Sequence, residues 1–290
     1  VRSTMLSQWA KLITRHRDEL AKIIRSESGK PATEALLEVD SCAEYFRWFA
    51  GEALRLFGET IPSPNAKTRH WTVREPIGCV GVITPWNFPM AMLARKLSAA
   101  LAAGCTVVAK PSELTPLSAV ALVNLGFSAG VPSGAINVIS GTASVIGDEL
   151  CRHPSIRQIS FTGSTTVGNI LQQKAVGKRL AMELGGNAPF VICADALLDD
   201  AVNALIQAKF RNAGQTCVAP NRVLVAKSLY PELKKRLVRA MQRVGFASGR
   251  KVETIIGPLI SPKHHQRLKE LVETACQYGA RRIYIHKDLP

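Results

Sequence analysis

Residues 77–109 read IGCVGVITPWNFPMAMLARKLSAALAAGCTVVA, and this stretch decides the fold. Its two ends, Ile77–Ile83 and Cys105–Ala109, are short apolar runs of the kind that form buried strands. Its middle part, Met90–Ala103, is typical of a helix and is followed by Gly104, a helix-stop signal. A strand, a helix and a second strand in this order predict two parallel strands joined by a crossover helix.

The same alternation continues along the chain and predicts an α/β fold. The further expected strands are Ala135–Ser140, Gln158–Phe161 and Arg179–Leu184, and the further expected helices are Leu117–Ala129, Ala143–Cys151 and Thr165–Val176. We therefore expect a doubly wound, Rossmann-type parallel sheet. The first 57 residues are predicted to be helical, since Leu6, Trp9, Leu12 and Ile13 recur on one helical face.

A second α/β unit is predicted after Gly185-Gly186. Its expected elements are strand Pro189–Cys193, helix Leu198–Asn212, loop Gly214–Pro220 and strand Arg222–Ala226. We therefore divide the chain into a domain of residues 1–185 and a domain of residues 186–290. Within the first, residues 58–76 begin with Gly58-Glu-Thr-Ile-Pro-Ser-Pro and then alternate polar and apolar residues to Val73, a pattern that a surface loop would also give.

The charge of +15 suggests anionic partners, but its distribution argues against nucleic acid. Residues 231–290 hold 13 Lys/Arg against 5 Asp/Glu, and over Pro231–Gly245 the basic residues alternate with apolar ones at helical spacing. This pattern is typical of a solvated helix face. The longest uncharged apolar run, Leu97–Ala109, is too short to span a bilayer, so we expect neither nucleic acid nor a membrane as partner.

The seven cysteines indicate a reducing compartment, the cytoplasm or alternatively the mitochondrial matrix. Their number is odd and no Cys-x-x-Cys pair occurs, so neither a disulfide framework nor a metal site is expected. Cys79, Cys105 and Cys193 lie in apolar runs and are expected to act as small hydrophobic residues. Cys217 instead lies in a polar loop bounded by glycine.

Three segments carry residues suited to covalent catalysis. Cys217 ends Gly-Gln-Thr-Cys, Glu183 lies in Met-Glu-Leu-Gly-Gly-Asn, and Asn87 lies in Pro-Trp-Asn-Phe-Pro. A thiol attacks as the thiolate, a separate carboxylate can activate water, and a side-chain amide can stabilise an oxyanion. Alone, a loop cysteine or a glutamate before two glycines is more often structural. Together the three indicate a nucleophile with its helpers.

These segments resemble the NAD(P)-dependent aldehyde dehydrogenases, and the resemblance runs from about residue 2 to about residue 279. It implies that the Cys217 thiolate adds to the aldehyde while the Asn87 amide and the Cys217 backbone N–H stabilise the oxyanion. Glu183 would then activate the water that hydrolyses the thioester. The second domain is the catalytic domain in this resemblance.

The chain lacks the Gly-x-Gly-x-x-Gly fingerprint, but the resembled family binds its cofactor without it. The resemblance implies that Lys110 and Glu113 reach the adenosine ribose, that Gly163 and Ser164 meet the pyrophosphate at a helix N-terminus, and that Val167 packs on adenine. The other implied cofactor contacts are Ile83, Trp86, Asn87, Pro111, Ser112 and Leu184. A carboxylate at Glu113 suits ribose hydroxyls better than a 2′-phosphate, which favours NAD, with NADP as the alternative.

Two arginines indicate the substrate. Arg95 and Arg211 match the positions that hold the substrate carboxylate in succinate-semialdehyde dehydrogenases, and the guanidinium fork suits a carboxylate. Either one alone could be a surface arginine that covers apolar neighbours. The expected reaction is oxidation of succinate semialdehyde to succinate. The alternatives are another acidic or small aliphatic aldehyde, or a non-catalytic pseudo-enzyme subunit.

The resemblance also implies what lies beyond this sequence. The family pattern continues with a Glu-x-Phe-Gly-Pro segment, whereas here the match ends at Gly279 and Arg281–Pro290 departs from it. We expect a chain truncated at both ends, with an incomplete second domain, impaired activity and poor solubility. In the family, the hairpin at 58–76 serves homo-oligomerisation. Ala219 stands where some relatives carry a second, redox-active cysteine, so no such switch is expected.

Overall fold

The computed structural model describes residues 1–246 and 254–284, which form two compact units. The first unit contains Val1–Glu27 and Ala35–Leu184, and the second contains Ser28–Glu34 and Gly185–Pro290. Residues 28–34, which were predicted to belong to the first domain, group with the second unit. One reason is Gly29 (φ 70°), where an added Cβ would lie 2.5 Å from the ring of Pro258.

The first unit is built on a five-stranded parallel sheet with the order β5-β4-β3-β6-β7. Its strands are β3 (Cys79–Ile83), β4 (Thr106–Lys110), β5 (Ile136–Val138), β6 (Ile156–Thr162) and β7 (Arg179–Glu183). The order reverses between β3 and β6, which are direct neighbours. The doubly wound α/β sheet is thus confirmed, and its topological switch point lies between these two strands.

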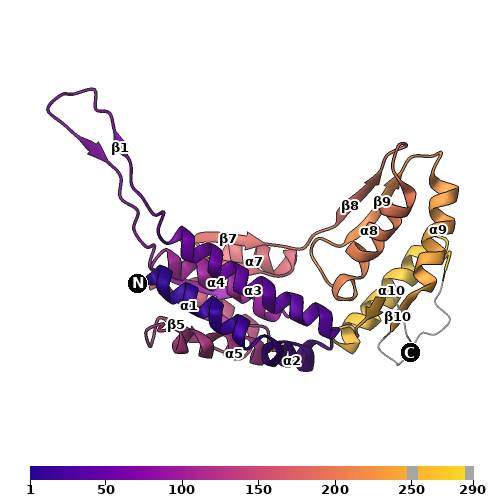
Figure 1. The fold of residues 1–290 in the computed structure, drawn as a ribbon, viewed down its shortest axis with the longest axis horizontal. Coiled ribbons are helices and arrows are strands. Elements are labelled where there is room, and N and C mark those ends of the chain that lie inside the picture. Colours follow the sequence, from indigo (N-terminus) through magenta and orange to yellow (C-terminus); the bar gives the residue numbers. More distant parts are fainter. Residues whose placement is uncertain (247–253, 285–290) are drawn as a thin grey trace. The chain divides into compact units, whose positions relative to one another are not determined.

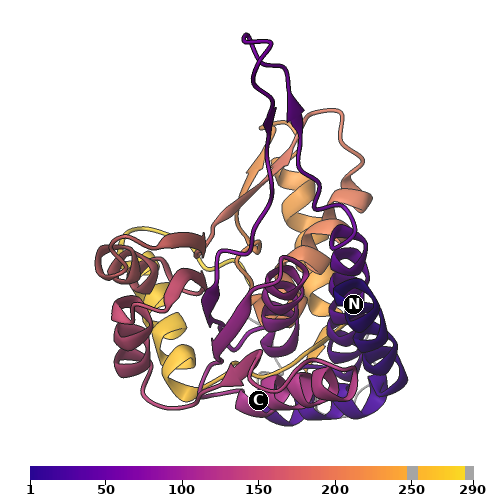
Figure 2. The same ribbon diagram turned by 90° about the vertical axis from the view of Figure 1, so that its left-hand side faces the viewer.

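Helices cover both faces of this sheet (Figure 2). The crossover helices are α4 (Pro89–Ala102), α5 (Pro116–Ser128), α6 (Ala143–Arg152) and α7 (Thr165–Lys174). Val80 and Val82 point to the face that packs with α4 and α5, while Ile159 and Phe161 point to the face that packs with α6 and α7. Because successive strand residues face opposite sides, each strand contributes to two separate cores.

The N-terminal helices form a further layer outside α4 and α5. They are α1 (Arg2–Arg15), α2 (Arg17–Ser28) and α3 (Ala32–Glu52), as the apolar periodicity predicted. Leu6, Trp9 and Ile13 are fully buried, and the Trp9 indole donates a hydrogen bond to the Leu122 carbonyl of α5 (3.1 Å). This layer therefore fixes α5 against the sheet.

Residues 58–76 form a hairpin, which extends away from the helices of its unit (Figure 1). Its strands β1 (Thr60–Ile61) and β2 (His70–Trp71) are antiparallel, with Thr60 opposite Trp71. Ile61, Trp71 and Val73 are exposed. The structure therefore selects the hairpin over the irregular surface loop, and its apolar side chains remain accessible.

The second unit contains two short parallel pairs of strands and three helices in its described part. The elements are β8 (Ala188–Ile192), α8 (Leu198–Phe210), the 3-10 turn η1 (Arg211–Gly214), β9 (Pro220–Val225), α9 (Tyr230–Gln242), β10 (Val244–Phe246), β11 (Thr254–Ile256) and α10 (Pro262–Gln277). Strand β8 pairs with β9, and β10 with β11. Ile192, Val202 and Leu233 form the small core between β8, α8 and α9.

Two details of this unit differ from the sequence prediction. Helix α8 ends at Phe210 rather than near Asn212, because Arg211 (φ −52°, ψ 127°) already leaves the helical region and the left-handed Asn212 and Ala213 follow it. Cys193 is exposed just after β8, so its expected role as a buried hydrophobic residue is wrong. No helix in the described part is both long and apolar enough to cross a membrane. Of Arg281–Pro290, residues 285–290 lie outside the described residues.

Candidate active site

The predicted cofactor residues of the first unit follow the carboxyl ends of its strands. Thr84–Asn87 follow β3, Pro111–Glu113 follow β4, Gly163–Ser164 follow β6, and Leu184 follows β7. Ligands of open α/β sheets bind at this edge, next to the switch point. The topology therefore brings Ile83, Trp86, Lys110, Gly163 and the other predicted contacts to a single edge of the sheet.

This edge has unsatisfied polar groups that fit a dinucleotide. Thr84 directly follows β3, and Thr162 is the last residue of the neighbouring strand β6. The hydroxyls of both are buried without a hydrogen-bond partner. Buried polar atoms normally find partners, so these hydroxyls indicate room for ligand hydrogen bonds. Ser164 caps α7 by accepting the Val167 N–H (3.3 Å), and the Val167 side chain is 44% exposed, as an adenine contact requires.

Lys110 and Glu113 form an ion pair at the same edge. The Lys110 ammonium is buried and lies 2.7 Å from a Glu113 carboxylate oxygen, while Glu113 is exposed. Partial burial acts to raise the pKa of Glu113, but hydrogen bonds from Lys110 and from backbone N–H groups outweigh it, and the pKa lies below its ordinary value. Glu113 is therefore an ionised acceptor, suited to hydroxyl donors.

Asn87 is held in a rigid loop before α4. Its Oδ1 accepts the Phe88 backbone N–H (3.0 Å), which helps to orient the side-chain amide. Glu38, which is 3% exposed, accepts the N–H groups of Met90 (2.9 Å) and Ala91 (3.2 Å). A carboxylate at a helix N-terminus stabilises that helix end, so Glu38 fixes the start of α4 and the loop that carries Asn87.

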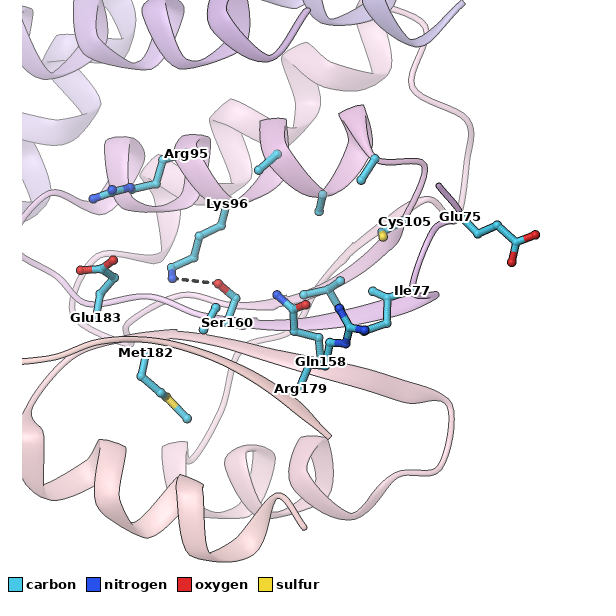
Figure 3. Close-up of a pocket in the computed structure, with 15 residues that line it drawn as sticks. Glu75, Ile77, Arg95, Lys96, Cys105, Gln158, Ser160, Arg179, Met182 and Glu183 are labelled. Carbon is cyan, nitrogen blue, oxygen red and sulfur yellow. Dashed lines mark hydrogen bonds between the residues drawn. The ribbon is translucent and has the colours of Figure 1, made fainter. Parts of the chain in front are cut away.

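A pocket of about 460 Å³ lies between α4 and the sheet (Figure 3). Arg95 and Lys96 enter it from α4, and Glu183, the last residue of β7, lies at the same end as Arg95 (Figure 3). The Lys96 ammonium donates to the Ser160 hydroxyl (2.9 Å). The guanidinium of Arg95 also lies over the Tyr45 ring, 5.6 Å from its centroid. The Glu183 carboxylate thus shares one pocket with Arg95 and Lys96, and Arg179 and Glu75 also line it.

The charge of Lys96 is set by its burial. Its side chain is nine-tenths buried, and this desolvation, together with the nearby Arg95 cation, lowers its pKa from 10.5 to about 8. The Glu183 carboxylate partly opposes the shift. Lys96 is therefore a cation beside Glu183 at neutral pH and loses its proton in mildly alkaline solution.

Lys96→Met should increase the free energy of unfolding more at about pH 7 than at about pH 9.5. The folded state releases the Lys96 proton near pH 8, whereas the unfolded state keeps it to about 10.5, so the original chain gains stability as pH rises through this window. Methionine does not titrate, so it cannot make that gain. The difference in free energy of unfolding between Lys96→Met and the original chain should therefore shrink by about 1–2 kcal/mol between the two pH values. Urea unfolding at both pH values measures it, with the exposed Lys22→Met as control. An advantage that is equal at both pH values would contradict this effect.

In the second unit, Cys217 lies three residues after the 3-10 turn and is exposed. The turn begins at Arg211, which is also exposed, and contains Asn212 (φ 51°) and Ala213 (φ 55°). Left-handed backbone costs a residue with a side chain about 1–2 kcal/mol, so this turn is strained. Such strain is common at functional sites, where surrounding contacts maintain it.

Gly186 packs directly against the segment that carries Cys217. A Cβ added at Gly186 would lie 2.1 Å from the Cys217 carbonyl oxygen, so only glycine allows the two backbones to approach this closely. Gly186 comes three residues after Glu183 along the chain. The second glycine of the Gly-Gly pair that follows Glu183 and Leu184 therefore accommodates the Cys217 segment.

The predicted site residues divide between the two units. Asn87, Glu183, Arg95 and all predicted cofactor contacts belong to the first unit, and Cys217 and Arg211 belong to the second. Sequence reasoning missed Lys96, Glu38 and the hydroxyls of Thr84 and Thr162. The largely apolar residues around Lys96 in α4 gave a weak signal of its burial, whereas Glu38 and the threonines gave none.

Comparison with known proteins gives a consistent result. The family model described as "Aldehyde dehydrogenase family" matches residues 1–287. The chain is 47% identical to the probable succinate-semialdehyde dehydrogenase of Sinorhizobium fredii, whose name specifies NADP(+), and 43% identical to the glutarate-semialdehyde dehydrogenase of Pseudomonas putida. Each match covers 97% of this chain, but only 58% and 59% of the relative.

A solved structure shows the same fold. The crystal structure of an aldehyde dehydrogenase from Brucella melitensis biovar abortus 2308 matches with a TM-score of 0.95 and 43% identity. The match covers all of this chain and 60% of that one. The chain therefore spans somewhat more than half the length of the proteins it matches.

Proposed function

Because this chain belongs to the aldehyde dehydrogenase family, we propose that it carries the residues that oxidise succinate semialdehyde to succinate with a nicotinamide dinucleotide. The observation that carries the proposal is the first unit's pocket, where Glu183 shares one end with Arg95 and lies near the Lys96 cation. A general base beside fixed cations suits hydrolysis of an acyl group that bears a carboxylate. The strained, glycine-flanked Cys217 segment of the second unit supplies the nucleophile.

In the proposed first step, the Cys217 thiolate adds to the aldehyde carbonyl and forms a carbon–sulfur bond. The electron pair of the carbonyl moves to oxygen, and the Asn87 side-chain amide donates a hydrogen bond to this oxyanion. The Phe88 N–H on Oδ1 holds the amide in the orientation that presents its N–H groups. Removing one such donor typically costs about a hundredfold or more in rate.

A bound nicotinamide dinucleotide would supply the hydride acceptor, whose reduction leaves Cys217 acylated as a thioester. Glu183 then takes a proton from water, the water oxygen attacks the thioester carbonyl, and the thiolate leaves. The products are the carboxylic acid and the free Cys217 thiolate. The Lys96 ammonium places a positive charge near the Glu183 carboxylate.

For the cofactor, Lys110, Glu113, Gly163, Ser164 and Val167 would hold the adenosine and pyrophosphate parts. We propose NAD as the better cofactor, since the ionised Glu113 accepts from ribose hydroxyls and repels a 2′-phosphate. The name of the Sinorhizobium fredii relative specifies NADP(+), so the activity of this chain is to be measured with both NAD and NADP.

For the substrate, the two arginines favour an aldehyde with a carboxylate at its far end. Arg95 is fixed by its contact with Tyr45, and guanidinium forks bind carboxylates in a bidentate way. The names of both relatives give the semialdehyde of a dicarboxylic acid as substrate. The chain length that the site accepts, succinate or glutarate semialdehyde, is to be measured.

Arg95→Ala and Arg211→Ala should each raise KM for succinate semialdehyde by about 10- to 100-fold, the usual loss for a hydrogen bond to a charged group. KM for a neutral aldehyde such as butanal should change by less than about threefold, because no carboxylate is lost from its binding. Initial rates of NADH formation measure both. Arg95→Lys and Arg211→Lys keep the charge and should recover part of the loss. Equal increases in KM for both aldehydes would exclude a carboxylate-binding role of the two arginines.

We further propose that the hairpin of residues 58–76 contacts a second copy of the chain. Ile61, Trp71 and Val73 are exposed on it, and exposed apolar side chains gathered on a projecting hairpin are typical of an interaction surface. Sedimentation of the chain and of Trp71→Ser compares their assembly states.

A further inference from the structure

The backbone before Cys217 adopts a conformation that its sequence does not favour. Asn212 and Ala213 are consecutive left-handed residues with side chains, and Gly214 (φ 75°) continues the run. Glycine adopts such angles freely, asparagine tolerates them and alanine does not. Contacts from elsewhere in the unit must therefore hold this turn in place.

Glu34, in the first turn of α3, supplies one of these contacts. Both of its carboxylate oxygens lie 3.0 Å from the backbone nitrogen of Asn212 and accept its N–H. Asn212 is 4% exposed, so water cannot readily replace this acceptor. A buried N–H without an acceptor is costly, and a carboxylate is the strongest acceptor a side chain offers.

Gln215 supplies the second contact, from the other side of the turn. Its side-chain nitrogen donates to the Asn212 carbonyl (3.0 Å), and its side-chain oxygen accepts the Ile260 backbone N–H (3.0 Å). The N–H and the carbonyl of Asn212 are thus both bound by side chains. Cys217 follows Gln215 by two residues, so the anchored turn leads directly into the nucleophile.

We infer that Glu34 is a positioning residue for the Cys217 nucleophile, acting through the backbone of Asn212. This inference rests on the proposed function, because only there is Cys217 the attacking group. Glu34 contacts no reacting atom in this account. Its carboxylate holds the left-handed turn, and the turn fixes where the thiol stands.

Trypsin tests the contact without any need for activity. The scissile bond Arg211–Asn212 contains the very N–H that Glu34 binds, and Arg211 is exposed. Glu34→Ala should be cleaved there about tenfold faster or more, since the turn opens more often without its acceptor. Glu34→Gln should lie between, because its amide oxygen can still accept. Cleavage after the exposed Lys227 should not change, and the exposed Glu273→Ala of the same unit is the matched control.

Catalysis tests the positioning role. In Glu34→Ala, kcat should fall about tenfold or more while KM for the dinucleotide stays within about twofold, because only the nucleophile is displaced. Adding Ala213→Gly to Glu34→Ala should recover about threefold or more of kcat, since glycine adopts the left-handed turn without help.

Two results would overturn the inference: cleavage at Arg211 at the original rate in folded Glu34→Ala, or a parallel rise at Lys227, which would indicate general unfolding. A kcat that Ala213→Gly does not restore would also count against it. If the original chain forms no NADH at all, the proposed function fails on its own, and the trypsin rates still decide whether Glu34 holds the turn.

Discussion

Cys217→Ala should reduce NADH formation from succinate semialdehyde by about 10⁴-fold or more. Removing the nucleophile of a covalent mechanism eliminates the thiohemiacetal and thioester, and what remains is binding and oxyanion stabilisation alone. Dinucleotide binding should be retained, because all predicted cofactor contacts lie in the first unit. Stopped-flow NADH fluorescence and a separate dinucleotide titration measure the two properties.

Cys193→Ala is the matched control for this variant. Cys193 is also exposed and belongs to the same unit, yet it has no place in the proposed chemistry. Its rate should remain within about twofold of the original chain, as expected for a surface substitution. If Cys217→Ala kept a substantial part of the rate, the covalent mechanism would be excluded. A folded chain that binds NAD but gives no first turnover would favour the pseudo-enzyme alternative.

Glu183→Gln should lower the steady-state rate by about 10²- to 10⁴-fold and leave the first turnover intact. Glutamine fills the same space but cannot take a proton from water, so the thioester forms and is not hydrolysed. The expected time course is a burst of about one NADH per chain followed by a slow phase. The size of this burst should be the same for any aldehyde that acylates Cys217.

The control for Glu183 is a second glutamate that lines the same pocket. Glu75 lies at the opposite end of the pocket from Glu183 (Figure 3). Glu75→Gln removes the same charge from the pocket but does not remove the proposed base. It should therefore preserve both the burst and the steady-state rate. A lost burst in Glu183→Gln would instead place Glu183 in acylation or in folding, and loss in both variants would indicate a general charge effect.

Much of the fold follows from local patterns in the sequence. The strands of the first unit are short apolar runs bounded by glycine or polar residues, and they pair in parallel, as the alternation with helices predicts. The helices of the N-terminal layer follow from the spacing of Leu6, Trp9 and Ile13, all of which are buried. The strands are continuous apolar runs because both faces of the sheet are covered.

The departures arise where distant contacts override local preference. Asn212 and Ala213 directly follow the end of α8 and its capping residue, and Glu34, far away in the sequence, and Gln215 bind the left-handed turn that they adopt. Residues 28–34 group with the second unit because Gly29 packs on Pro258, more than two hundred positions away. No local pattern signals such pairings.

The candidate site shows the same division. Motifs identified Cys217, Glu183 and Asn87 because their neighbours, glycines and prolines, mark special backbone. Lys96 and Glu38 were missed because their roles come from burial: Lys96 meets Ser160 of β6, and Glu38 meets the start of α4. Burial of a charge can be recognised only once its partner is known.

The central claim is that Cys217 carries the acyl group and that Glu183 releases it. The most direct measurement mixes Glu183→Gln with NAD and succinate semialdehyde, quenches with acid after one turnover, and maps the acylated peptide by mass spectrometry. The account predicts a succinyl thioester on Cys217, in an amount equal to the NADH formed. NADH formation with Cys217 unmodified, or with the succinyl group on another residue, would contradict it.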